Sequence, residues 1–220
     1  MYAFINNLLR LLHSKINRGD IMTESSKLIE LLYIQNESRN IEYKTTYNWN
    51  EPSHKAKITK TILAMSNIRD GGYLILGVRE LENHTFSVDG MPQEHFELLN
   101  QDDLMSHINN YADPYVTFIL HKFDIDNKFF AIFEVMEFEQ VPVICKRDGV
   151  ANLQVGAIYT RSRQMAATAT VNNQAEMREI IDIAIEKGVR RLQQTIFRAG
   201  LSIELQQSED EKFQKELGGL

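Results

Sequence analysis

The apolar run over residues 73–78 constrains the fold more than any other stretch of the chain. A strand that lacks a polar face is typically buried on both sides of its sheet. The turn Asp70-Gly71-Gly72 precedes this run, and glycine accepts a positive φ without steric cost. Before the turn, apolar residues recur at helical spacing over residues 54–66. The sequence therefore predicts a helix, a tight turn and a central strand covered on both faces.

The remaining elements indicate an α+β (mixed α/β) fold with a central mixed β-sheet, because a strand, a helix, a strand and a helix are followed by several strands. Alternating side chains predict a strand over residues 41–46, and Asp126-Asn127 joins two strands as a hairpin. The other predicted helices span residues 2–18, 24–33, 101–111 and 173–198, and the other predicted strands span residues 86–88, 116–125, 128–136, 141–146 and 157–161.

Four segments follow from this reading: an N-terminal helical extension (1–35), one domain (36–171), a C-terminal amphipathic helix (172–200) and an acidic tail (201–220). Asn173 and Glu176 form a capping-box pattern at the start of the long helix, and Gly200 ends it. Its predicted apolar stripe consists of Met177, Ile181, Ala184, Leu192 and Ile196.

Composition limits the class of protein. The 220 residues carry a net charge of -6, which argues against a protein that coats nucleic acid through its overall charge. Cys145 is the single cysteine, and the six histidines form no close pair, so neither a disulfide nor a structural zinc site is expected. No apolar run is long enough to cross a bilayer. We therefore expect a cytoplasmic protein without a membrane partner.

Three acids and one lysine are the candidate site residues. In a strand, Glu42 and Lys44 share a face, and Glu37 lies five residues before Glu42. Glu80 comes just after the central strand, and a helical crossover would make the two strands neighbours. The alternative is that Glu37 and Glu42 are surface acids in weak ion pairs with Lys44 and Arg39.

Several motifs together resemble the Schlafen-type AlbA-like domain. They are Glu37-Ser38 followed by Glu42-Tyr43-Lys44, then Met65-Ser66-Asn67, Gly71-Gly72 and the Leu74–Val78 run. Later landmarks are Asp89-Gly90, Asp126-Asn127-Lys128, Val141-Pro142-Val143 and Ile158-Tyr159-Thr160-Arg161-Ser162. The similarity covers about residues 36–171, and the terminal helices lie outside it.

The resemblance implies a metal-dependent RNA-cleaving site made of three acids, whose matching positions are Glu37, Glu42 and Glu80. The family usually has aspartate at the third position, and Glu80 is one methylene longer. Mg²⁺ or Mn²⁺ would be the cofactor, because these cations prefer carboxylate oxygens and activate water for phosphodiester hydrolysis. Lys44 would assist by stabilising charge on the scissile phosphate.

Local cations would hold the nucleic acid, with RNA expected before DNA. Residues 36–171 contain 18 acids and 13 bases, a net charge of -5, which suits a nuclease better than a pure binding module. No phosphate-binding loop of the Gly-x-x-x-x-Gly-Lys type occurs, so ATP is not an expected partner. The candidate contacts are Lys55, Lys57, Lys60, Lys146, Arg147, Arg161 and Arg163.

The leading hypothesis is thus a divalent-metal-dependent endonuclease. A defence or toxin effector is one biological role that such an enzyme could have. Schlafens pair two such lobes, so a homodimer or higher homo-oligomer is expected, with the terminal helices as its interface. One alternative is a non-catalytic nucleic-acid-binding or regulatory module. Another is a structural or interaction subunit that uses the C-terminal helix.

Overall fold

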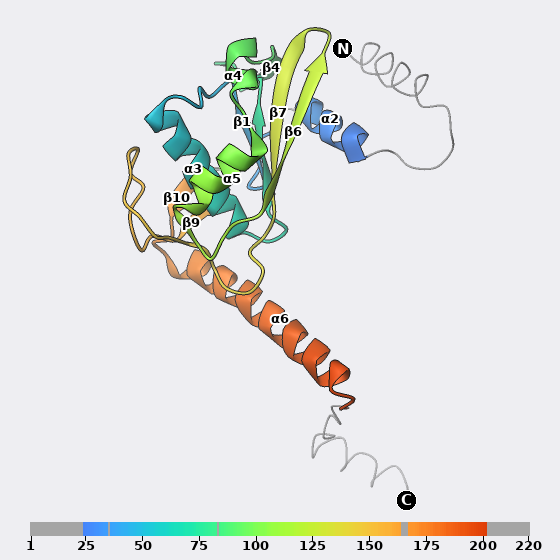
Figure 1. Cartoon of the computed structure of the whole chain (residues 1–220), viewed down its shortest axis with the longest axis vertical. Coiled ribbons are helices and arrows are strands. Elements are labelled where there is room, and N and C mark those ends of the chain that lie inside the picture. Colours follow the sequence, from blue (N-terminus) through green and yellow to red (C-terminus); the bar gives the residue numbers. More distant parts are fainter. Residues whose placement is uncertain (1–23, 35, 83, 164–166, 202–220) are drawn as a thin grey trace, which may run out of the picture.

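The structure is a computed structural model that describes residues 24–34, 36–82, 84–163 and 167–201. It shows an α+β domain from which one long helix extends (Figure 1). The central sheet has the order β1-β2-β7-β6, with β1 parallel to β2 and the other neighbours antiparallel. The predicted fold class is therefore confirmed. The four strands are β1 (Ile41–Lys44), β2 (Gly72–Leu76), β6 (Phe118–Ile125) and β7 (Lys128–Val135).

Helices cover both faces of this sheet (Figure 1). On one face, Leu74 and Leu76 of β2 join a core that includes residues of α3 (Pro52–Ser66) and α5 (Gln101–Asn109). On the other face, Ile75 packs in a second core with Leu32 of α2 (Glu24–Ile34). Burial on both faces explains why β2 has no polar side.

The last turn of α3 is tied to the rest of the domain by Asn67, which is fully buried. Its side-chain amide donates to the carbonyl oxygens of Val143 (2.8 Å) and Tyr159 (2.9 Å) and accepts from the Val143 N–H (2.8 Å). These three bonds satisfy backbone groups of two segments distant in the sequence, which gives the Met65-Ser66-Asn67 motif a structural role.

The predicted strand over residues 73–78 is in fact two strands. Gly77 has a φ of 103°, and a Cβ there would lie 2.6 Å from the Phe130 ring. The chain bends at this residue into a separate ribbon formed by β3 (Val78–Glu80) and β4 (Phe86–Val88). Glu80 therefore belongs to the ribbon and not to the central sheet.

Shorter pairs complete the domain. The predicted strand over residues 141–146 shrinks to β8 (Ile144–Cys145), which pairs with β5 (Ala112–Asp113). β9 (Tyr159–Arg161) pairs with β10 (Thr168–Thr170) and packs on α3. Neither β5, β10 nor the short helix α4 (Gln93–Glu97) was predicted, because such short elements depend on partners distant in the sequence. The predicted helix over residues 2–18 and residues 202–220 of the tail lie outside the described residues.

The helix α6 (Gln174–Arg198) has the predicted caps. The Asn173 side chain accepts from the Glu176 N–H at 3.0 Å, and Gly200 has a φ of 69° just beyond the last turn. Most of the predicted apolar stripe, however, does not face the domain: Met177, Ile181 and Leu192 are exposed, and only Ala184 packs against the core. Ile180 and Ile183 are buried instead. Within the described part of the chain, no helix is both long and apolar enough to cross a membrane.

Candidate functional site

The structure brings Glu37, Glu42 and Lys44 together around β1. The Lys44 ammonium lies 2.9 Å from Glu42 Oε1 and 3.9 Å from Glu37 Oε1. Glu37 Oε1 also accepts from the Tyr43 N–H at 3.0 Å, which fixes the carboxylate beside the strand. Tyr43 itself points into the core on the α2 side, so the predicted alternation places Glu42 on the α3 side.

Glu42 is buried and neutralised from two directions. Its Oε2 lies 2.5 Å from Nη1 of Arg161, a side chain that is only 1% exposed, and 3.5 Å from the Thr61 hydroxyl of α3. Burial lowers the pKa of Arg161, while the negative charges of Glu42 and Glu37 act in the opposite direction. Burial and the charge of Glu42 also raise the pKa of the neighbouring Tyr47. Arg161 was expected to contact nucleic acid from a strand end, but its guanidinium is instead enclosed in the domain.

Glu80 does not join this cluster. Its side chain is half exposed on the β3–β4 ribbon and pairs with His84 at 2.9 Å. Among the described residues, no group of three or more His, Cys, Asp or Glu side chains is placed to hold a metal ion. As arranged here, the predicted donor set does not fit Mg²⁺ or Mn²⁺, because two protein cations occupy the Glu42 oxygens and the third acid lies elsewhere.

A second ion-pair cluster links α6 to the turn before β1 and to the segment after β9. Glu179 is bound by Arg39 Nη1 at 2.6 Å and by Arg163 Nε at 3.2 Å. Burial alone would raise the pKa of Glu179, but the hydrogen bonds and charges of the two arginines lower it below its ordinary value. Arg39 Nε also donates to the Arg161 carbonyl at 2.6 Å. Arg39, which the sequence placed beside Glu37 and Glu42, is thus engaged with α6.

The other predicted cations form one surface, which we call the α3 cationic surface: Lys55, Lys57, Lys60, Lys146 and Arg147. None of them takes part in an ion pair within 4 Å among the residues that the structure describes. They differ in this from Arg161 and Arg163, whose charges are compensated internally.

Aromatic rings support three of these lysines. The ammonium groups of Lys55, Lys60 and Lys146 lie 5.1, 4.9 and 5.1 Å from the ring centres of Trp49, Tyr159 and Tyr115, respectively. Such cation–π contacts orient a lysine without consuming its charge. Trp49 is buried in the core, so its ring packs there and holds Lys55 at the surface.

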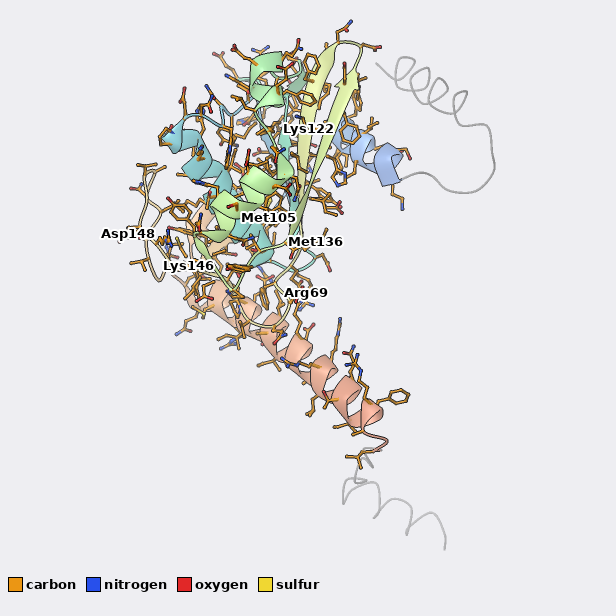
Figure 2. The ribbon with its side chains drawn as sticks, in the orientation of Figure 1. Arg69, Met105, Lys122, Met136, Lys146 and Asp148 are labelled. Atoms are coloured by element: carbon orange, nitrogen blue, oxygen red, sulfur yellow. The ribbon has the colours of Figure 1, made fainter. Side chains whose placement is uncertain are left out.

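The two parts of the α3 cationic surface are physically connected. The His107 ring contacts both Trp49 and Tyr111, and the Tyr111 carbonyl accepts from the Lys146 N–H at 2.8 Å. Figure 2 shows Lys146 and Asp148 on the loop beside the β9–β10 pair. Lys57 lies one helical turn before Thr61, whose buried hydroxyl lies 3.5 Å from Glu42.

The sequence did not identify Tyr115 as a candidate contact for nucleic acid. Its side chain is 75% exposed beside Lys146, and an exposed aromatic ring next to a cation is a typical stacking surface for a base. The only signal in the sequence was its position directly after Asp113-Pro114, which predicts a turn and not a contact.

Comparisons with known proteins identify similar chains. One curated relative, an uncharacterized ATP-binding protein of Ureaplasma parvum serovar 3, is 32% identical over 92 residues, which are 42% of this chain and 24% of the relative. The chain therefore spans about a quarter of that relative's length. The name of this relative goes against our expectation that ATP is not a partner.

Two solved structures are also similar. A crystal structure of a Corynebacterium diphtheriae protein has a TM-score of 0.43 at 14% identity and covers 80% of this chain and 27% of its own. A solution structure of the N-terminal domain of a protein from Nitrosomonas europaea, described as related to the ATP-dependent DNA helicase RecG, has a TM-score of 0.39 at 19% identity. It covers 70% of this chain and 99% of its own.

The sequence model of the family described as Schlafen, AlbA_2 matches residues 37–170. This match begins at Glu37, ends at the last residue of β10 and includes Glu42, Lys44 and the α3 cationic surface. Because it covers more than half of the chain, the protein belongs to the Schlafen AlbA_2 family.

Proposed function

We propose that the chain binds nucleic acid, RNA in preference to DNA, through the α3 cationic surface. The family relationship associates the chain with a nucleic-acid-related function. The observation that carries the proposal is the absence, among the described residues, of an ion-pair partner for any of the five cations of this surface. Unpaired cations attract phosphate groups and gain free energy from the counterions that the nucleic acid releases.

The aromatic neighbours favour a strand with unpaired bases. Tyr115 is exposed beside Lys146, so a base that stacks on the ring would leave its phosphate within reach of the loop cations. Backbone contacts of this kind position the strand and carry little sequence information. The proposed ligand is therefore a single-stranded segment or loop of RNA.

Metal-dependent cleavage of the bound RNA is the second candidate, and the proximity of Glu37, Glu42 and Lys44 favours it. The salt bridge between Glu42 and Arg161 weighs against it, because a carboxylate already held by two cations is a poor metal ligand. The binding role is therefore the better supported of the two. ATP is a third ligand to test, since one relative is named as ATP-binding.

The binding test uses fluorescence anisotropy with a labelled single-stranded RNA, an RNA hairpin and a single-stranded DNA in EDTA. We expect Lys55→Glu/Lys146→Glu to weaken RNA binding more than tenfold and to reduce its salt dependence, by roughly 0.7 in logarithmic slope per lost phosphate contact. The matched control is Lys27→Glu, an exposed lysine on α2 at the other face of the sheet, which should bind like wild type. Equal losses in both variants, or no RNA binding by wild type at low salt, would refute the proposal.

The cleavage test incubates the same RNAs with Mn²⁺ or Mg²⁺ and compares wild type with Glu42→Gln. Glutamine preserves the shape of the side chain, and the folded fraction of the variant is measured first, because Arg161 loses its charged partner. Binding that persists in EDTA without cleavage in either metal supports the binding role. Metal-dependent cleavage that Glu42→Gln abolishes supports the nuclease. Displacement of RNA by ATP at micromolar concentration would instead assign the surface to nucleotides.

A further inference from the structure

Helix α6 has two apolar faces, and the domain covers only one of them. Ile180 and Ile183 are buried against the domain. A second row, which we call the outer stripe, consists of Met177, Ile181, Ile185, Val189 and Leu192, and each of these side chains is exposed. Their spacing of four, four, four and three residues places them on one side of the helix. A solvent-exposed apolar stripe of this length is typical of a surface that another helix covers.

The second half of α6 projects from the domain and keeps few contacts with it, among them the hydrogen bond that Arg191 donates to Gln140. Figure 1 shows the helix projecting beyond the body of the protein, and from Gly188 onward every described residue except Ile196 is exposed. A helical segment of this length with so little tertiary packing has marginal stability in water. Packing of the outer stripe against a partner would supply the missing stabilisation.

Among the described residues, no atom occupies the space that a side chain at Gly188 would enter. Glycine is a poor helix former, yet this residue lies in the interior of α6, and a Cβ there would meet no atom within 4 Å. In a helix pair, however, a residue without a side chain lets the two backbones approach closely. The glycine lies beside the outer stripe, where such an approach would occur.

The outer stripe continues into a groove of about 740 Å³ between α6 and the loop over residues 139–142. Apolar side chains from both sides line it, including Val141 and Pro142 of the loop and Ile181 and Ile185 of α6. Val141 is itself exposed. The groove therefore extends the apolar surface of the outer stripe from α6 onto the loop over residues 139–142. An apolar side chain of a neighbouring helix would fit into this groove.

The distribution of charge along α6 selects the partner and its direction. Residues 174–186 carry four acids and one arginine, a net charge of -3, although two of these acids, Glu179 and Glu186, already pair with arginines of the domain. Residues 187–198 carry four bases and no acid, a net charge of +4. Two parallel copies would place the basic halves together, whereas two antiparallel copies place each basic half beside an acidic one.

We propose that α6 pairs with α6 of a second copy of this chain in an antiparallel arrangement, along the outer stripe. We place Ile181 opposite Leu192 of the partner subunit, a register that sets Ile185 opposite Gly188 of the partner subunit at the crossing point. The domains lie on the outer sides of the pair, because Ile180 and Ile183 hold each domain on the other face of its helix. This pairing does not depend on the nucleic-acid-binding proposal.

The first test measures the mass of the full chain by sedimentation velocity between 1 and 100 µM. We expect wild type to form dimers and Leu192→Glu to shift the distribution to monomers. Leu192 lies in the projecting half of the helix, so this change spares the domain, which circular dichroism verifies. The matched control is Phe197→Glu: Phe197 is 83% exposed on the same helix but lies off the outer stripe, so this variant should remain dimeric. A monomeric wild type at 100 µM, or equal effects of the two variants, overturns the proposal.

The second test determines the direction of the helices by disulfide cross-linking with oxidised glutathione. Ile181 and Leu192 are separated by about 16 Å along one helix, too far for an internal disulfide. In the antiparallel pair, the double variant Ile181→Cys/Leu192→Cys forms covalent dimers, whereas neither single variant does. Covalent dimers of Leu192→Cys alone would show a parallel pair and refute the arrangement. Wild type controls for Cys145, which is buried.

Discussion

Replacing Arg161 by methionine tests the most buried ion pair of the domain. The Arg161 side chain is 1% exposed and the Glu42 side chain 9% exposed, and their charged atoms lie 2.5 Å apart. Without the guanidinium, the partners of Glu42 in the described part of the chain are Lys44 at 2.9 Å and the Thr61 hydroxyl at 3.5 Å. Removing one partner of a buried pair typically costs about 3–5 kcal/mol.

We expect a loss of about 3 kcal/mol for Arg161→Met, at the lower end of that range, because Lys44 remains beside the carboxylate and is 37% exposed to water. Such a loss is a large part of the roughly 5–15 kcal/mol that stabilises an average domain. At about 2–4 °C per kcal/mol for a chain of this size, the melting temperature should fall by roughly 6–12 °C.

The assay is urea unfolding followed by the fluorescence of Trp49, which is the single tryptophan and is buried. Wild type, Arg161→Met, Glu42→Gln and the double variant form a mutant cycle. Because each single variant leaves one buried group without its partner, the double variant should lose about 1–3 kcal/mol less than the sum of the two single losses. Additive losses would mean that the two side chains do not stabilise each other, and the reasoning on this pair would be refuted.

Two further tests concern the turn before β2 and the ion pairs of Glu179 on α6 with Arg39 and Arg163. Gly71 and Gly156 both have a positive φ, but a Cβ at Gly71 would lie 1.9 Å from a backbone oxygen of β7, whereas a Cβ at Gly156 meets nothing within 4 Å. Gly156→Ala should therefore lower the free energy of unfolding by about 1 kcal/mol, and Gly71→Ala should lower it clearly more, as measured by urea unfolding. Equal losses in the two variants would contradict the steric argument. For Glu179, the lowered pKa means that the unfolded chain binds the proton more tightly than the folded chain does. Its stabilisation is thus complete above the ordinary pKa of 4.5 and is lost as the pH falls through the lower folded value. Glu179→Gln should therefore be less stable than wild type at pH 7, and this difference should shrink as the pH is lowered below 4.5. A stability difference that stays constant over this pH range would show that the pairing with Arg39 and Arg163 contributes nothing.

The buried pair also affects how mutants of this family member are interpreted. A Glu42→Ala variant removes the charge that compensates Arg161, so a loss of nucleic-acid binding or cleavage in that variant would partly report on folding. Arg161→Met offers a comparison, because it disturbs the same pair from the other side and keeps the carboxylate. If binding follows stability in both variants, Glu42 acts through the fold and not through contact with the ligand.

Local patterns in the sequence determined much of the architecture. Side-chain alternation placed Glu42 and Lys44 on one face of β1, and the apolar run placed β2 between two layers. The sequence also predicted the ends of α6 at Asn173 and Gly200. These features depend on residues that are close in the sequence, where strand and helix periods decide which side chains share a face.

Only the tertiary structure decided which groups meet. Arg161 reaches Glu42 across 119 positions, so its burial follows from the packing of β9 on α3 and not from any local pattern. The bend at Gly77 lies against Phe130 of another strand, where a Cβ would not fit, and it carries Glu80 away from Glu42. Periodicity likewise showed that α6 is amphipathic but not which apolar face meets the domain. Long-range contacts settle these points, because a side chain's partner depends on how distant segments cross in space, which the period of a single segment does not encode.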